Sequence, residues 1–234
     1  MDNNKFLISF LILATSTTQV YALKTYSEVR GNFFDLTAFQ MNLGASSFHT
    51  NSNTHFLPQN VFNADSFRSS GLHGALNITD LKFFAPCWLI GARIGAEGFS
   101  NLKNDVYSPL VVNGIPTGYS YQRQGGGFVD VVLETMQNQH WYLDAFAGAG
   151  YNRYSFKEFN TPLTDNYNWT VNARVGVGAG LVLQEYYSVG IEYTHDFAIK
   201  QSFSSVNLNN YQYGNYSFNS NGNSIDLTFR AYMN

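Results

Sequence analysis

Few side chains in this 234-residue sequence have the spacing that catalysis or metal binding requires. His195 and Asp196 are adjacent, and neighbouring side chains of a β-strand point to opposite faces, so this pair is not a catalytic dyad. Asp130 and Glu134 share one face, but their separation suits a row of interior charges better than acid–base chemistry. The remaining histidines show no metal-ligand spacing: His49, His55, His73 and His140.

Two further features lack the context that their chemistry needs. The glycines at 125–127 begin a strand-like segment instead of joining a strand to a helix, so they do not form a phosphate-binding loop. Cys87 is the only cysteine, and we expect it to be a small apolar filler. No His-x-Ser, the pair that lipid A deacylases of similar size use, occurs in the sequence. We therefore expect no catalytic residue, no cofactor and no metal site.

The first 22 residues have the features of a secretory signal peptide. Lys5 supplies a positive charge, residues 6–14 form an apolar run that only Ser9 interrupts, and Ala22 stands at the expected cleavage point. The alternative is an uncleaved anchor, but this run is too short to span about 30 Å of hydrocarbon as a helix. We expect cleavage after Ala22, which leaves residues 23–234 as one domain.

The composition indicates that the domain faces lipid. Apolar residues make up 44% of the chain and aromatic residues 17%, yet the mean hydropathy is −0.19. Charged residues are only 12%, against about 25% in an average soluble protein. A barrel with a lipid-facing exterior and a polar interior has such a composition. The net charge of −3 gives no reason to expect nucleic-acid binding.

Eight segments alternate apolar and polar side chains with a period of two, which is typical of β-strands. They lie at about 38–48, 67–79, 87–99, 122–135, 140–153, 168–183, 187–197 and 223–233. The connections at 136–139 and 184–186 are very short and that at 80–86 is moderate, whereas those at 49–66, 100–121, 154–167 and 198–222 are long. Short periplasmic turns and long extracellular loops are expected of an outer-membrane barrel. We predict an all-β fold: a closed, antiparallel, up-and-down transmembrane β-barrel of eight strands.

The positions of the charged residues indicate which face of each strand points into the barrel. When the lipid face is assigned from apolar residues alone, ten charged residues fall on the opposite face, toward the lumen. We expect a buried charge network in which Arg93, Arg174 and Arg230 pair with the surrounding carboxylates. Its members are Arg93, Glu97, Asp130, Glu134, Asp144, Arg174, Glu192, Asp196, Asp226 and Arg230.

Aromatic residues near the segment ends predict two girdles at the membrane interfaces. Those expected at the periplasmic edge are Trp88, Trp141, Tyr187 and Tyr232, and those toward the outer edge include Trp169 and Tyr193. The alternative, a soluble β-sandwich, needs a second sheet to cover the apolar faces.

Glycine-alternating segments and the closing segment carry a family resemblance. These segments are Gly-Ala-Gly-Tyr at 148–151, Gly-Val-Gly-Ala-Gly-Leu at 176–181 and the closing segment 224–234. On these segments and the rhythm of strands and loops, residues 23–234 resemble the small eight-stranded outer-membrane barrels, the OmpA-like transmembrane domain and opacity-protein type. Such barrels usually end in an aromatic residue, whereas this sequence ends in Met233 and Asn234.

The resemblance implies a bacterial outer-membrane protein that contacts outer-membrane lipid. We expect a monomer with a structural and surface-interaction role, similar to that of an adhesin, in which four extracellular loops meet a host or surface ligand. On this hypothesis it is not an enzyme. Two alternatives remain open: an outer-membrane enzyme that acts on lipid or peptide, and a narrow pore for small solutes.

Overall fold

The computed structural model describes residues 36–56, 61–101, 104–112, 115–137, 140–158, 166–183, 186–206 and 212–233. The predicted signal peptide, residues 1–22, lies outside the described residues. Within them, no helix has both the length and the apolar character needed to cross a membrane.

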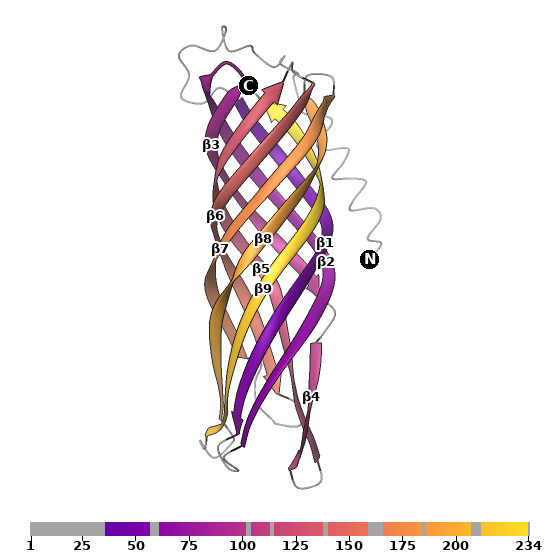
Figure 1. Cartoon of the computed structure of the whole chain (residues 1–234), viewed down its shortest axis with the longest axis vertical. Helices are drawn as coiled ribbons and strands as arrows, with labels where there is room; N and C mark the ends of the chain where they lie inside the picture. The colour runs from indigo at the N-terminus through magenta and orange to yellow at the C-terminus, as the bar shows by residue number, and fades with distance from the viewer. Residues whose placement is uncertain are drawn as a thin grey trace.

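Antiparallel strands form a tall cylinder whose members tilt strongly relative to its long axis (Figure 1). The strands are β1 (Leu36–Phe56), β2 (Val61–Ala85), β3 (Trp88–Asn101), β4 (Asn104–Val112), β5 (Ile115–Gln137), β6 (Trp141–Glu158), β7 (Asn166–Leu183), β8 (Tyr187–Val206) and β9 (Gln212–Met233). Sequential neighbours pair except for β3 and β4, β9 pairs with β1, and a ladder between β3 and β5 closes a ring of eight strands. The ninth strand, β4, pairs only with β5. The predicted eight-stranded barrel is confirmed.

Tight turns connect the strands at one end of the cylinder, which we call the turn end. The predicted short connections after β5 and β7 are found there. The predicted connection at 80–86 is wrong, because β2 continues to Ala85 and only Pro86 and Cys87 separate it from β3. Cys87 is exposed in this turn with a φ of 141°, so the expectation that it fills apolar space is also wrong.

The opposite end, which we call the loop end, differs most from the sequence-based expectation. Much of the four predicted long loops is strand: β1 runs to Phe56, β8 to Val206, and β9 starts at Gln212. Here the ring divides into two four-stranded sheets. The β1 lobe comprises 61–70 of β2, 47–56 of β1, 212–222 of β9 and 199–206 of β8; the β5 lobe comprises β4, 115–124 of β5, 151–158 of β6 and 166–173 of β7.

Ladders end on both sides of each lobe. The β2–β3 ladder ends at Gly71 and Asn101, and the β7–β8 ladder ends at Arg174 and Asp196. Beyond these points no ladder joins the two lobes among the residues that the structure describes. Figure 1 shows the β4–β5 hairpin standing apart from the tips of the β1 lobe.

A β-bulge accompanies each division of the ring. The β5–β6 register shifts between Arg123 and Gly125, where Gly125 has a φ of 138°. The β8–β9 register shifts between Asp196 and Ile199. An extra residue on one strand bends it and increases its twist. The bulges therefore let the two lobes bend away from the common ring. On β5 and β8, even-numbered residues point inward within the ring, whereas odd-numbered residues point inward beyond the bulge.

Burial follows the predicted period of two over the ring. Apolar side chains project outward and remain exposed, with Ile94 at 66%, Val131 at 61% and Ile225 at 60%. The side chains between them point into the lumen and are buried. In water such a surface would be unfavourable, whereas in a bilayer it meets hydrocarbon.

One strand pair approaches so closely that only glycine fits. A Cβ at Gly148 would lie 2.7 Å from the Cα of Asp130 and would also overlap the carbonyl of Val129. We predict that Gly148→Val lowers the free energy of unfolding by about 1–3 kcal/mol through overpacking, or prevents folding. The measurement is the heat-dependent gel shift of refolded barrel. The control is Ala147→Val on the exposed face of the same strand; equal loss in both variants would contradict the explanation.

Candidate functional site

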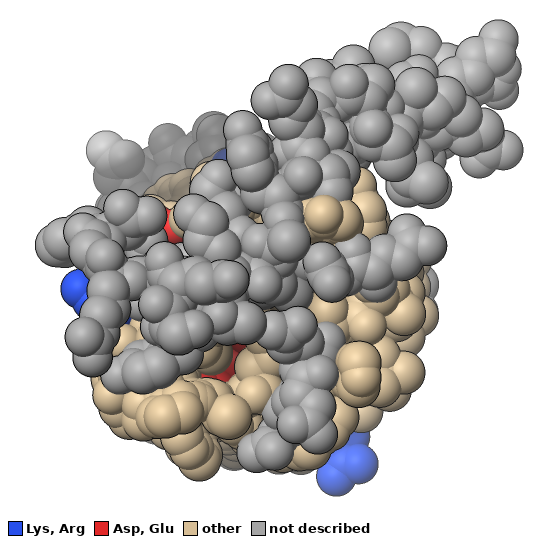
Figure 2. Space-filling model, turned by 90° about the horizontal axis from the view of Figure 1, so that it is seen from above, with Lys and Arg blue, Asp and Glu red and all other residues tan. Residues whose placement is uncertain are grey.

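The lumen holds all ten charged residues that the sequence assigns to it. Their exposed fractions lie between 0% for Glu134 and 7% for Glu97. Viewed from the turn end, red acidic side chains are visible inside the outline, while the blue Lys and Arg side chains in view lie at its edge (Figure 2).

Each lumenal arginine bridges two carboxylates. The Arg93 guanidinium lies 2.6 Å from Glu192 on β8 and 2.9 Å from Asp130 on β5. Arg230 reaches across from β9 to Glu134 at 2.7 Å and to Asp144. Arg93–Glu192 and both pairs of Arg230 join strands that are not neighbours in the ring, whereas Arg93 and Asp130 are direct partners in the β3–β5 ladder. Removing one member would leave a buried charge without its partner, which is strongly unfavourable.

The ion pairs continue from one arginine to the next. Arg174 contacts Asp130 at 3.4 Å and Glu97 at 3.0 Å. Glu97 is also 2.8 Å from Arg123, which in turn lies 2.8 Å from Asp196. Asp130 and Glu97 are thus shared carboxylates that link Arg93, Arg174 and Arg123 into one chain of ion pairs. Arg230 forms a separate group with Glu134 and Asp144.

Sequence reasoning missed Arg123 and His73. Arg123 is odd-numbered on β5, where odd positions such as Val129 point outward, but the bulge before Gly125 turns it inward. The three consecutive glycines at 125–127 were the available signal for that irregularity. His73 shares the inward parity of β2 and lies 2.8 Å from Asp226. The alternation of inward and outward side chains along β2 indicates that His73 points into the lumen, whereas its spacing to the other histidines gives no such signal.

Aromatic rings support the lumenal arginines. The Cζ atom of Arg93 lies 3.9 Å from the ring centre of Phe146, and that of Arg174 lies 4.0 Å from Phe128. Arg230 stacks over Tyr142 at 4.1 Å. A guanidinium over an aromatic face gains electrostatic attraction and keeps its edge free for carboxylates.

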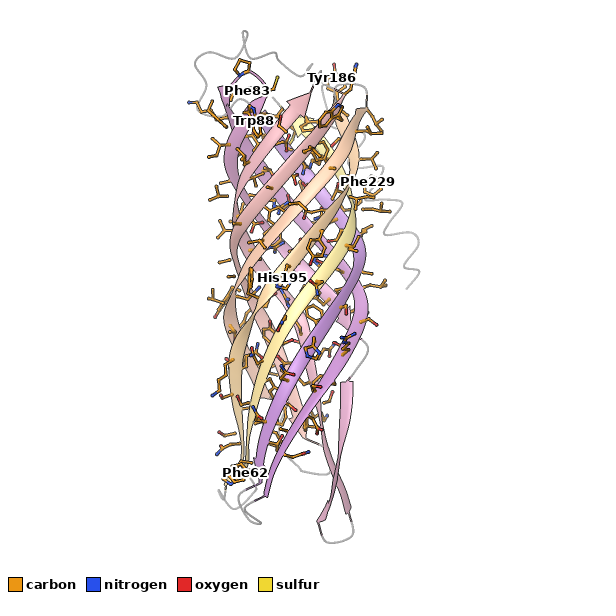
Figure 3. The ribbon with its side chains drawn as sticks, viewed as in Figure 1. Phe62, Phe83, Trp88, Tyr186, His195 and Phe229 are labelled. Atoms are coloured by element: carbon orange, nitrogen blue, oxygen red, sulfur yellow. The ribbon has the colours of Figure 1, made fainter. Side chains whose placement is uncertain are left out.

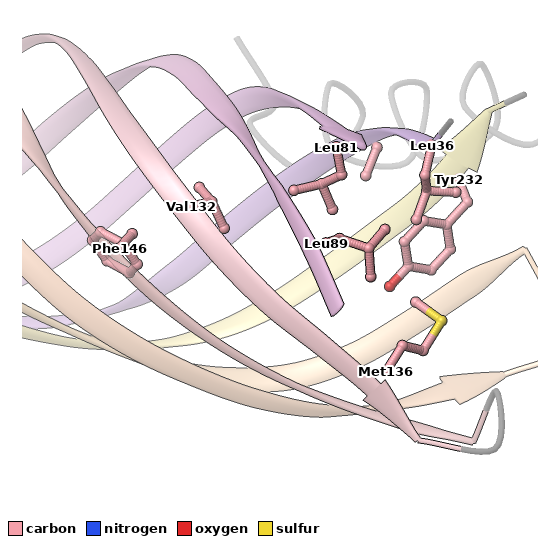
Figure 4. Close-up of a cluster of buried hydrophobic side chains, with 8 residues drawn as sticks. Leu36, Leu81, Leu89, Val132, Met136, Phe146 and Tyr232 are labelled. Atoms are coloured by element: carbon pink, nitrogen blue, oxygen red, sulfur yellow. The ribbon is translucent and has the colours of Figure 1, made fainter. Parts of the chain in front are cut away.

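An apolar cluster closes the lumen at the turn end (Figure 4). It consists of Leu36, Ala38, Leu81, Leu89, Val132, Met136, Phe146 and Tyr232. The prediction that Tyr232 belongs to an interfacial girdle is wrong. This side chain is only 6% exposed and donates a hydrogen bond to Ser188 Oγ at 3.1 Å. Tyr232 is an even-numbered residue of β9, as Asp226 and Arg230 are, and therefore points into the lumen.

A second apolar layer, which we call the aromatic plug, fills the space between the two lobes. Its members are Tyr119, Tyr121, Tyr154, Phe156, Phe203, Tyr216 and Phe218. Rings from opposite lobes stack directly: Tyr121 and Phe218 have centroids 4.3 Å apart at an interplanar angle of 15°. Burial raises the pKa of the Tyr119 hydroxyl, which donates to Ser52 Oγ at 2.7 Å. The plug thus holds the lobes together where no backbone ladder does.

The other predicted interfacial aromatics project from the outer wall. Trp88 is 44% exposed, Trp141 38%, Trp169 48% and Tyr193 40%, while Tyr187 is half-buried. In Figure 3, Trp88 lies at the turn end and His195 lies far from either end. His195 hydrogen-bonds Asn223 at 2.8 Å on the outside, whereas Asp196 points into the lumen.

The described residues contain no group of three or more His, Cys, Asp or Glu placed to hold a metal ion. The carboxylates of the lumen are instead engaged by arginine and by amides; Asn42, for example, donates to Glu192 at 3.0 Å. The arrangement can neutralise charge and fill space. Recognition of a ligand must then be sought at the loop end, where exposed polar side chains gather.

Comparison with known proteins identifies the architecture. No family model and no curated protein sequence matches the chain. Its structure is similar to the outer membrane protease OmpT from Escherichia coli, with a TM-score of 0.51 and 12% identity over 88% of this chain and 100% of that one. It is also similar to the outer membrane protein OprG from Pseudomonas aeruginosa, with a TM-score of 0.50 and 12% identity over 84% of this chain and 95% of that one.

The chain has the closed-barrel fold of bacterial outer-membrane proteins. The exposed apolar belt therefore meets the hydrocarbon of the outer membrane. Short turns of such barrels lie on the periplasmic side, so the turn end is periplasmic and the two lobes are extracellular. Because the identities are low, these likenesses concern the fold.

The lumenal ion pairs generate a stability prediction. Arg93→Met leaves the buried carboxylate of Glu192 without its arginine, and we expect the free energy of unfolding to fall by about 3–5 kcal/mol. Urea unfolding of barrel refolded into lipid vesicles measures this change. The matched control is Arg68→Met, since Arg68 is exposed on β2. A loss no larger than that of the control would show that the network does not stabilise the barrel.

Proposed function

We propose that this chain is a non-catalytic surface protein that binds an extracellular partner through its lobes, as an adhesin does. The observation that carries the proposal is the exposed outer face of the β1 lobe. Asparagine and serine side chains project from it on three strands, among them Asn53, Ser202 and Asn215. Such residues form hydrogen bonds adaptably and are common in binding surfaces.

The filled lumen favours this function over a pore. Three layers follow one another along it: the apolar cluster at the turn end, the arginine–carboxylate network and the aromatic plug. An eight-stranded barrel has an interior that its own side chains just fill. The space between the lobes, where a substrate would have to enter, is likewise taken by the aromatic plug, which favours binding over catalysis.

The pore alternative makes the opposite prediction in planar bilayers. We expect refolded protein to leave the membrane current at its baseline, because buried ion pairs and stacked rings occupy the path. The control is a known open porin, reconstituted in the same bilayer. Stable, reproducible conductance steps from the full-length chain would instead support the pore.

Adhesion is the direct test of the proposal. A non-adherent Escherichia coli strain that displays the chain should bind cultured epithelial cells at least about tenfold better than the strain with empty vector. A second strain displays a variant with Asn53→Ala, Ser202→Ala and Asn215→Ala, and we expect it to lose most of the gain. Display must be matched by the heat-dependent gel shift. No gain for the unaltered chain would refute the adhesin role.

A further inference from the structure

A concave site of about 430 Å³ lies at the tip of the β1 lobe. All four strands of the lobe contribute to its lining: Asn53 comes from β1, Phe62 from β2, Lys200 from β8 and Asn215 from β9. Figure 3 shows Phe62 at the extreme loop end of the barrel. Asn53, Ser202 and Asn215 project from the outer face of the sheet, and Phe203 and Tyr216 of the aromatic plug lie behind them in the lining.

An exposed aromatic platform forms one side of this site. Phe62 and His55 are directly opposite in the β1–β2 ladder, and their rings stack with centroids 3.9 Å apart at 12°. Phe62 is nevertheless 72% exposed, the highest value among the exposed large apolar side chains described. A ring that is held in place yet open to solvent can receive a flat, weakly apolar ligand face.

Amides and hydroxyls form a regular array beside the platform. Asn215 lies between His55 on β1 and Ser204 on β8, and accepts a hydrogen bond from Ser204 at 3.2 Å. In the next row, Ser217 lies between Asn53 and Ser202. These side chains offer donors and acceptors at strand spacing, about 4.8 Å from one strand to the next.

Lys200 supplies a positive charge to the lining of the site. Lys200 and His55 are its basic residues, and none of the described residues that line it is Asp or Glu. The neighbouring carboxylate of Asp65 accepts a hydrogen bond from Asn63 at 3.0 Å. An anionic group at the Lys200 end would thus meet a cation without facing an opposing carboxylate in the lining.

We infer that this site binds an acidic saccharide. The C–H face of a sugar ring packs on Phe62, ring hydroxyls bond to the asparagine and serine array, and a carboxylate or phosphate substituent pairs with Lys200. A purely apolar ligand would cover these polar side chains without hydrogen-bonding to them, which is unfavourable. The inference rests on the proposed surface-binding function and names the ligand class of that function.

Two sources supply this chemistry beside an outer-membrane barrel. One is the phosphorylated sugar of lipopolysaccharide in the surrounding leaflet, and the other is a sialylated or uronic-acid glycan on another cell. Both present a sugar ring with an anionic substituent, so the same residues serve either. The experiment therefore includes one probe for each source.

Calorimetry on the refolded full-length barrel in detergent provides the test. The probes are 3′-sialyllactose, lactose as its neutral counterpart, and soluble phosphorylated core oligosaccharide of lipopolysaccharide with its dephosphorylated form. We expect at least one acidic probe to bind about tenfold more tightly than its neutral counterpart, because hydrogen bonds to charged groups are the stronger ones. The acidic probe that binds identifies the source.

Variants assign the binding to this site. Phe62→Ala should lower the affinity of the barrel for the acidic probe about tenfold or more, because it removes the platform. Lys200→Gln should lower the affinity for the acidic probe to that for its neutral counterpart. The matched controls are Phe197→Ala and Lys82→Gln, which are exposed on the outer wall elsewhere. Absence of saturable binding by every acidic probe, or unchanged binding in Phe62→Ala, overturns the inference.

The two proposals fail separately. If displayed protein mediates adhesion but the purified barrel binds no acidic saccharide, the site is assigned wrongly and the surface function stands. If the purified barrel binds the saccharide through Phe62 and Lys200 but cells do not adhere, the adhesin role falls and the site remains.

Discussion

The ladder between β3 and β5 is the constraint on which the rest of the structure depends. It skips β4 and closes the ring, so that every strand within the belt has two hydrogen-bonded neighbours. Closure is required because hydrocarbon cannot satisfy free backbone groups. It also gives each strand one face toward lipid and one toward a narrow interior. The arginine–carboxylate network follows, since polar side chains confined there must satisfy one another.

The alternation of apolar and polar side chains makes the ring and its lumenal charges predictable from the sequence. It does not locate the two bulges. Arg123 lies beyond one of them and therefore has the opposite parity from Val129 on the same strand. Its residue type favours an interfacial girdle for Tyr232, although its even-numbered position on β9 places it inside with Asp226 and Arg230. Position along a strand is thus more informative than amino-acid type for deciding which way a side chain points.

The lobes escaped prediction for a related reason. Within the belt the apolar residues point outward, whereas beyond it Tyr216 and Phe218 point inward and Asn215 and Asn219 point outward. The period of two persists, but its polarity reverses where lipid gives way to water. A segment with apolar residues inside and amides outside lacks the pattern of a lipid-facing strand and therefore resembles a loop in the sequence. The aromatic plug and the saccharide site both belong to these reversed segments.

This reversal also fixes the height at which the barrel sits. On β9 the outward positions change from Asn219, Asn221 and Asn223 to Ile225 and Leu227 within a few residues. Sinking the barrel would carry amides into hydrocarbon, and raising it would expose isoleucine and leucine to water; both displacements are unfavourable. The tip that bears Phe62 is consequently held at a set distance above the bilayer.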